Sequence, residues 1–184
     1  MTGTATPKPS AAISLTGRER TFGTDEIIVT KTDLGGRITY ANDVFLNISS
    51  LTEAQALGKP HSIIRHPHMP KCVFRLLWDT LKDGREIFAY VLNRAMNGDH
   101  YWVLAHVTPT QDMSGKIVSY HSNRRVPKPE IISGLIKPLY EQLYQIEQQH
   151  GGGPASIQHS MAVLNDTVRQ KASDYESFIF STNP

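Results

Sequence analysis

The residues best suited to chemistry lie in one short run, IIRHPHMP, which extends from Ile63 to Pro70 directly before a helical pattern. Arg65 offers a planar guanidinium that matches phosphate oxygens. His66 can donate a hydrogen bond or carry a positive charge. The prolines stiffen the run, which lowers the entropic cost of ordering it around a ligand. The run therefore suits the wall of a site for a flat, charged molecule, although the same side chains would also cap and brace the helix that follows.

Metal binding and catalysis receive less support. His66 and His68 are two positions apart, but no carboxylate or cysteine ligand lies near them in the sequence, so we expect no metal site. We find no nucleophile–base pair, glycine-rich phosphate loop or paired carboxylates, and we expect no catalytic residues and no enzyme activity. The GGGP run at 151–154 lacks the strand and the lysine of a phosphate-binding loop and is interpreted as a hinge between helices.

Composition indicates one ordinary domain with extensions in a chain of 184 residues. The charged fraction is 20%, and no apolar run approaches the roughly 20 residues of a membrane span. The first residues lack the features of a signal peptide, so we expect a cytoplasmic protein. The net charge is +2 with the two signs interspersed, which gives no stripe for nucleic acid. The single cysteine, Cys72, excludes an internal disulfide and is expected to pack on a helix.

Residues 23–126 contain the elements that must position the run. Hydrophobic periodicity and turn residues predict two strands, several small helices and then three strands in an antiparallel meander. Asn42 and Thr52 are placed to cap the first two helices. The expected strands are 27–32, 37–40, 86–96, 99–110 and 115–126, and the expected helices are 43–49, 52–58 and 70–84.

The two ends are expected to lie outside this unit. Residues 1–22 lack sustained periodicity and predict a flexible arm with a helical tendency near Arg18 to Arg20. Residues 127–184 predict a helical extension of two helices split near 151–154, the first bent or divided by Pro138. The apolar stripes of these helices must either fold back on the sheet or pair with another chain.

Four segments in register, ITYAND, IIRHPHMP, LLWDTLKDG and NRAMNGDHYWV, give a more specific pattern. With them the chain resembles, over about residues 22–126, the flavin-binding PAS domain of bacterial aerotaxis receptors. The resemblance implies an α+β PAS fold, in which a five-stranded antiparallel sheet carries small helices on one face. It also implies non-covalent FAD in a pocket between helices and sheet, with the flavin's redox state reported to a signalling partner.

Matching the family's motifs position by position implies a set of cofactor-binding residues. His68 stands where the family commonly has an acidic residue, so the role of that carboxylate does not transfer. The hairpin signature, Asn97 and Asp99 to Trp102, is also matched. The residues expected at the cofactor are Asn42, Arg65, His66, His68, Trp78 and Trp102.

The expected function is therefore a cytoplasmic FAD-binding redox or oxygen sensor for energy taxis. No membrane span or methyl-accepting domain follows in this sequence, so the chain is expected either to act through a separate chemotaxis-type transducer or to be an excised sensory module. A homodimer through the helical extension is a further expectation. Two alternatives stay open. The first is a haem-binding gas sensor with His61, His66, His68, His100 or His106 as axial ligand. The second is a cofactor-free PAS module that dimerises. Light-driven adduct chemistry is not expected, because Cys72 lies in the wrong motif.

Overall fold

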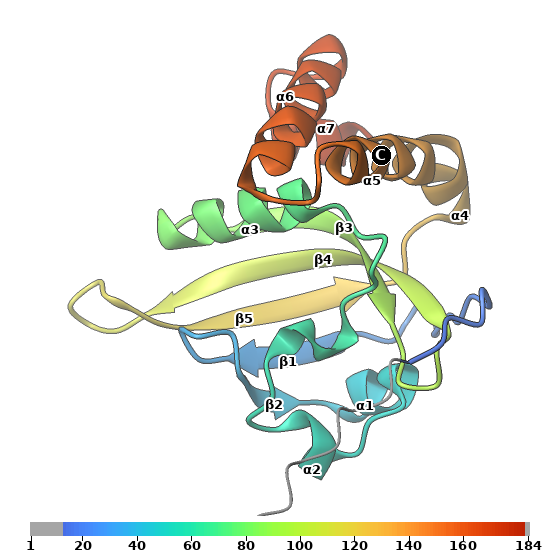
Figure 1. The fold of residues 1–184 in the computed structure, drawn as a ribbon. Helices are drawn as coiled ribbons and strands as arrows, with labels where there is room; N and C mark the ends of the chain where they lie inside the picture. Colours follow the sequence, from blue (N-terminus) through green and yellow to red (C-terminus); the bar gives the residue numbers. More distant parts are fainter. Residues whose placement is uncertain (1–12, 183–184) are drawn as a thin grey trace, which may run out of the picture.

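The computed structural model describes residues 13–182 and is built on a five-stranded antiparallel sheet with the order β2-β1-β5-β4-β3 (Figure 1). The predicted order of two strands, small helices and a three-stranded meander is confirmed. Tight turns join the long strands. One of them contains Gly98, which has a positive φ of 91°. The strands are β1 (Ile28–Thr32), β2 (Ile38–Ala41), β3 (Ile87–Arg94), β4 (His100–Gln111) and β5 (Ile117–Arg125).

Four helical segments separate β2 from β3 and lie against one face of the sheet. They are α1 (Asp43–Ser49), α2 (Glu53–Ala56), the one-turn η1 (His61–Ile64) and α3 (Lys71–Lys82). The caps form as the sequence predicts: the Asn42 side chain accepts from the amide of Phe45, and Thr52 and Gln55 form a reciprocal capping box.

Strand alternation divides the side chains of the sheet into two sets. In β3 and β4, Val91, Val103 and Ala105 point toward α3, whereas Leu92 and its cross-strand partner Trp102 point to the opposite face. This division decides which residues can reach a ligand held under α3.

The edge strand β3 is covered along its open side. Arg65 forms an isolated antiparallel bridge with Asn93, and the amide of Leu92 donates to the Met69 sulfur at 3.4 Å. The Tyr140 hydroxyl donates to the carbonyl of Tyr90 at 2.7 Å. These contacts satisfy edge groups that would otherwise be free to pair with another chain.

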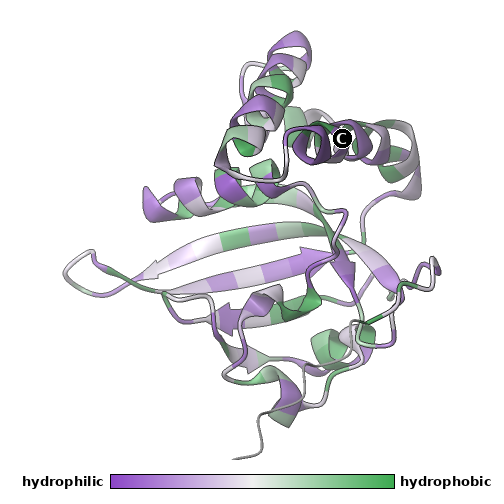
Figure 2. Cartoon of the chain, in the orientation of Figure 1, coloured by the Kyte–Doolittle hydropathy of each residue, from purple (hydrophilic) through white to green (hydrophobic). Residues whose placement is uncertain are grey.

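The C-terminal extension folds back on the domain and stacks beyond α3 (Figure 1). Pro138 lies in the first turn of α5, and the wider π turn η2 directly before it leaves room for the proline ring, so the helix is divided as predicted. Hydrophilic and hydrophobic residues are mixed along α5 and α6 (Figure 2), as in amphipathic helices. The elements are α4 (Pro129–Ile131), η2 (Ile132–Ile136), α5 (Lys137–Gln149), α6 (Pro154–Lys171) and α7 (Tyr175–Ser181).

The prediction of only two helices here is wrong, because α6 ends at Lys171 and α7 follows as a separate helix. The side chain of Asp174 accepts from the amide of Ser177 at 2.7 Å and so caps a new start. None of the helices among residues 13–182 is both long and apolar enough to cross a membrane.

Glu147 of α5 fastens the extension to α3. Its buried carboxylate, 1% exposed, accepts from the amides of Lys71 and Cys72 at 2.9 and 3.0 Å and from the Ser160 hydroxyl at 3.0 Å. Pro70 begins α3 without a side-chain cap, and Glu147 takes over this role at the positive end of the helix dipole. Cys72 is fully buried beside it, and burial raises the pKa of its thiol to about 12.

The described part of the predicted arm is not a free arm. Residues 1–12 lie outside the described part of the chain, but Arg18 and Arg20 exchange backbone hydrogen bonds with His100. The Asp99 carboxylate accepts from Thr16 and Arg18. These bonds hold residues 18–20 beside the start of β4, where Glu19 forms a parallel bridge with His100 and the helical tendency near Arg18 is not realised.

Candidate functional site

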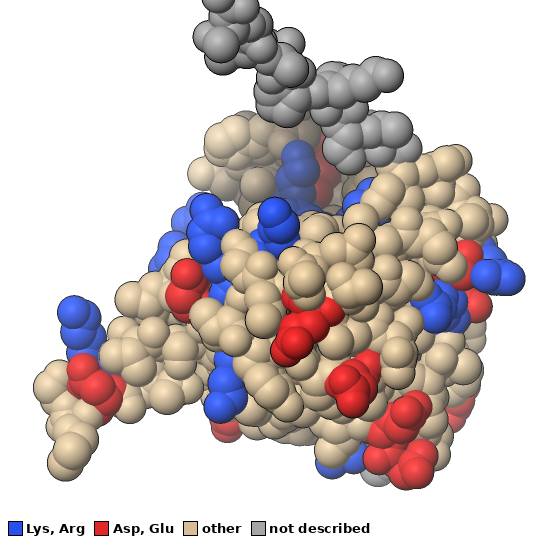
Figure 3. Space-filling model, turned by 90° about the horizontal axis from the view of Figure 1, so that it is seen from below, with Lys and Arg blue, Asp and Glu red and all other residues tan. Residues whose placement is uncertain are grey.

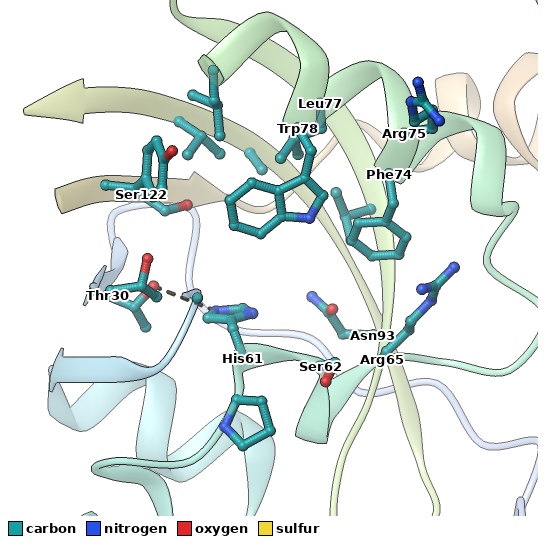
Figure 4. A pocket seen from close by; sticks show the side chains of 18 of the residues that line it. Thr30, His61, Ser62, Arg65, Phe74, Arg75, Leu77, Trp78, Asn93 and Ser122 are labelled. Carbon is teal, nitrogen blue, oxygen red and sulfur yellow. Dashed lines mark hydrogen bonds between the residues drawn. The ribbon is translucent and has the colours of Figure 1, made fainter. Parts of the chain in front are cut away.

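A cavity of about 530 Å³ lies between α3 and the sheet (Figure 4). Trp78 and Phe74 project from α3 toward His61 and Ser62 on the other side of it. Apolar residues of the sheet, among them Ala105, form its floor. Its size falls in the range of roughly 300–1,000 Å³ that small-molecule sites occupy, and its walls are mainly apolar, as a planar ring system requires.

Arg65 lies at one end of this cavity, near Asn93 (Figure 4). Its guanidinium carbon is 4.2 Å from the centroid of the Phe74 ring, a cation–π contact that orients the planar fork. Burial lowers the pKa of Arg65, and the charge of Glu147 opposes this shift. Arg65 is therefore a half-buried cation held in place beside the cavity.

The cavity wall contains polar atoms that the protein itself does not satisfy. Asn93 is 3% exposed, and its Nδ2 has no hydrogen-bond partner among the described residues; the same holds for the Ser122 hydroxyl. Buried polar groups are nearly always paired, so such atoms in a cavity wall point to a polar ligand. Both side chains line this cavity.

A third polar residue of the cavity wall, Arg124 of β5, links this strand to β1 and η1. One terminal nitrogen of Arg124 donates to the Thr30 hydroxyl at 2.9 Å and to His61 Nε2 at 2.8 Å. His61 Nε2 must therefore be an unprotonated acceptor. Burial and then the charge of Arg124 hold the pKa of His61 well below its usual range. His61 is a neutral hydrogen-bonding residue of the wall.

A second, more open cavity of about 1040 Å³ lies on the opposite face of the sheet. It is lined by His66, His68, Trp102 and Tyr140, and by residues 15–17 and 19–21. The Trp102 and Tyr140 ring centroids are 5.8 Å apart, which joins the sheet to α5.

The structure brings only two of the six expected cofactor residues to the first cavity, Arg65 and Trp78. His66, His68 and Trp102 line the second cavity instead. The run 63–70 crosses the edge of the sheet at β3, so that neighbouring residues are directed to opposite faces. Both polar groups of Asn42 are engaged in local bonds, to Ile27, Val29 and Phe45. The residues of the run IIRHPHMP therefore line two cavities, and not the single site that the sequence suggested.

His66 is expected to make the fold sensitive to acid. Its Nδ1 accepts from the His68 amide at 3.1 Å, and burial, followed by the charges of His68, His100 and Arg94, lowers its pKa from 6.5 to about 4. The unfolded chain binds this proton first, so the free energy of unfolding should fall as the pH drops from 6.5 to about 4. Urea unfolding across this range should show a shallower decline for H66N, whose amide oxygen can replace Nδ1. An H159N control changes an exposed histidine of α6 that is not among the causes of the lowered pKa, so it should keep the slope of the original protein. Identical slopes for H66N and H159N would remove His66 as the cause.

The residues of the first cavity that sequence reasoning missed include Thr30, Asn93, Ser122 and Arg124. A signal was present, because each is a polar residue on the inward-facing positions of a strand. Reading that signal requires the register of the strands, since Arg124 faces the cavity only because β5 pairs with β4 and β1 as it does. Among residues 13–182, no group of three or more histidine, cysteine, aspartate or glutamate side chains could hold a metal ion.

Comparison with known proteins agrees with this architecture. Residues 38–124 match the family described as PAS fold. The structure of the Aureochrome1 light-oxygen-voltage domain in the dark superposes with a TM-score of 0.54 over 60% of this chain and 83% of that one, at 23% identity. A light-oxygen-voltage domain studied with a flavin analogue superposes with a TM-score of 0.57 over 65% of this chain and 90% of that one, at 17% identity. Residues 38–124 therefore have a PAS fold, and the predicted fold is confirmed.

More specific likeness comes from sequence. The chain is 43% identical over 119 residues, 65% of its length, to the aerotaxis receptor of Escherichia coli, of which it covers 23%. It is 25% identical over 99 residues, 54% of its length, to the nitrogen fixation regulatory protein of Klebsiella pneumoniae, of which it covers 20%. The chain thus spans less than a quarter of either relative. The chain is thus similar to part of an aerotaxis receptor, as the sequence motifs predicted.

Proposed function

We propose that this chain is a cytoplasmic redox or oxygen sensor for energy taxis, which binds FAD without a covalent bond in the cavity under α3. The observation that carries the proposal is the cavity itself: an apolar slot beside Trp78 and Phe74, with unsatisfied polar atoms on Asn93 and Ser122. The 43% identity to an aerotaxis receptor supports the same assignment.

These residues fit the parts of FAD. The flat ring system needs an apolar slot, which the Trp78 side chain and Ala105 of the floor provide. Asn93 and Ser122 supply hydrogen bonds for the polar edge of the ring. Arg65, held against Phe74, supplies a planar fork for a phosphate. Bound flavin would supply reversible electron uptake, and the chain's own residues would bind and orient it.

The helical extension is the proposed output. Glu147 ties α5 to the first turn of α3, and Tyr140 binds the carbonyl of Tyr90 on β3, so both walls of the cavity contact the extension. A change of hydrogen bonding in the cavity that favours a second position of α3 would therefore be transmitted to α5 and α6. We propose that these helices act on a chemotaxis-type transducer or on a second copy of the chain.

The decisive experiment is the visible absorption spectrum of the purified protein, before and after addition of FAD. Flavin bands that stay with the protein on gel filtration are expected. A Soret band would identify haem instead, and a colourless protein that takes up no FAD would leave a cofactor-free interaction module as the function.

Arg65 provides a test of how FAD is oriented in the cavity. The variant R65M should weaken FAD binding by about 10- to 100-fold, because a charge-assisted hydrogen bond is lost. The same variant should bind riboflavin, which has no phosphate, almost as well as the original protein. The control is R85M, since Arg85 is an exposed arginine that does not line the cavity. Titration by flavin fluorescence measures all three proteins, and equal losses for FAD and riboflavin would show that Arg65 does not bind phosphate.

A further inference from the structure

Arg124 differs in its surroundings from the exposed lysines and arginines among residues 13–182. On the face of the molecule in Figure 3, basic and acidic side chains are exposed and interspersed. Arg124, in contrast, is 6% exposed and lines the first cavity. None of the ion pairs among the described residues includes it, and its second terminal nitrogen has no hydrogen-bond partner there.

The neighbours of Arg124 cannot balance its charge. His61 and Thr30 are neutral acceptors. Tyr101 is 1% exposed, and burial raises the pKa of its hydroxyl, which keeps it protonated. Burial lowers the pKa of Arg124 itself to about 10, so the guanidinium is still charged near neutral pH. A buried charge without a partner is energetically unfavourable, and an anion carried by the ligand would balance it.

The position of Arg124 indicates which part of the ligand carries this anion. Arg75, at the rim of the cavity, has a side chain that is 64% exposed, and Arg65 is half-buried. These outer cations suit phosphates, which stay near water. Arg124 projects from β5 in the sheet floor, beside Ala105 of β4, where only the ring can reach.

We infer that Arg124 is the internal counter-cation for the reduced flavin ring and holds that ring in its anionic form. This inference rests on the proposed function. Reduction of a flavin by an external electron donor adds two electrons with either one proton, which leaves the ring anionic, or two protons, which leaves it neutral. The guanidinium of Arg124 stabilises the negative charge and so makes the second proton unnecessary.

The experiment compares the original protein with R124M and R124K. The FAD-loaded proteins are titrated with dithionite at a series of mildly acidic pH values, at which free reduced flavin takes up the second proton. The pH dependence of the midpoint potential gives the number of protons per two electrons. One proton is expected for the original protein and for R124K, which keeps the charge, and two for R124M. The ligand-free proteins are unfolded in urea in parallel, and R124M should be at least as stable as the original protein, because it loses an unpaired buried charge.

The outcomes are distinct. The same proton number in the original protein and R124M, with FAD bound in both, would overturn the role of Arg124 and leave the proposed function intact. A destabilised ligand-free R124M with an unchanged proton number would make Arg124 a structural brace for Thr30 and His61. An original protein that takes up no FAD would overturn the proposed function and this inference together.

Discussion

The variant A105F is expected to lose FAD binding, with an affinity reduced by about 100-fold or more. Ala105 is 2% exposed, lies in the central part of β4 and forms part of the cavity floor. A phenylalanine there would project its ring into the slot and occupy the space that the isoalloxazine needs. A loss of this size corresponds to about 2.7 kcal/mol of binding free energy.

The matched control is L104F, one position away. Leu104 is half-buried, and its side chain points to the opposite face of the sheet. The two substitutions therefore place an added ring on opposite faces of the same strand. FAD affinity is measured by flavin fluorescence, and the free energy of unfolding of each ligand-free variant is measured in urea, since overpacking would lower it by about 1–3 kcal/mol. FAD affinity that survives in a folded A105F protein would place the flavin outside this cavity.

The variant E147A is expected to lower the free energy of unfolding by about 2–4 kcal/mol. It leaves the amides of Lys71 and Cys72 at the start of α3 without acceptors, and it also removes the bond from Ser160. A hydrogen bond to a charged group contributes about 1.5–3 kcal/mol, and an unsatisfied buried donor costs a similar amount. Because α3 carries Trp78 and Phe74, FAD affinity should also fall.

Two further variants separate the capping role of Glu147 from a general effect on α5. E147Q keeps one acceptor oxygen and should lose only part of the stability. E141A removes an exposed carboxylate from the same helix and should change stability by less than about 0.5 kcal/mol. Urea unfolding followed by circular dichroism measures all three, and equal values for E147A and E141A would show that the contact between α5 and α3 contributes little.

Much of the fold could be predicted because its signals are local. The caps at Asn42 and Thr52 each satisfy an amide three residues away, and the Asn97-Gly98 turn joins strands that are neighbours in sequence. The division of the extension at Pro138 follows from one residue's missing amide hydrogen. The break before α7 was missed because the apolar pattern runs through it, and only the cap at Asp174 marks the new start.

The site was predicted less completely. Arg65 and Trp78 were expected at the cofactor and do line the cavity, although their contact with FAD stays a prediction. Trp102 was expected beside them but lies on the other face with Tyr140. Asn93 was overlooked because it is a polar residue within the mainly apolar strand β3. Arg124 was overlooked because β5 is mostly polar, so that only the strand register shows which of its side chains face the cavity.

The amino-acid sequence by itself determined the class of fold, the positions of the strands and helices, and the likeness to the aerotaxis receptor, because caps, turns and periodicity act over a few residues. The tertiary structure alone decided which face each side chain occupies. Strand register carries Arg124 and Asn93 to one cavity, and the crossing of the run 63–70 over the edge of β3 separates Arg65 from His66. The tertiary structure also decided that Glu147 caps α3, although it lies more than 70 residues further along the chain than the start of that helix. These contacts depend on packing between distant segments, which no local pattern encodes.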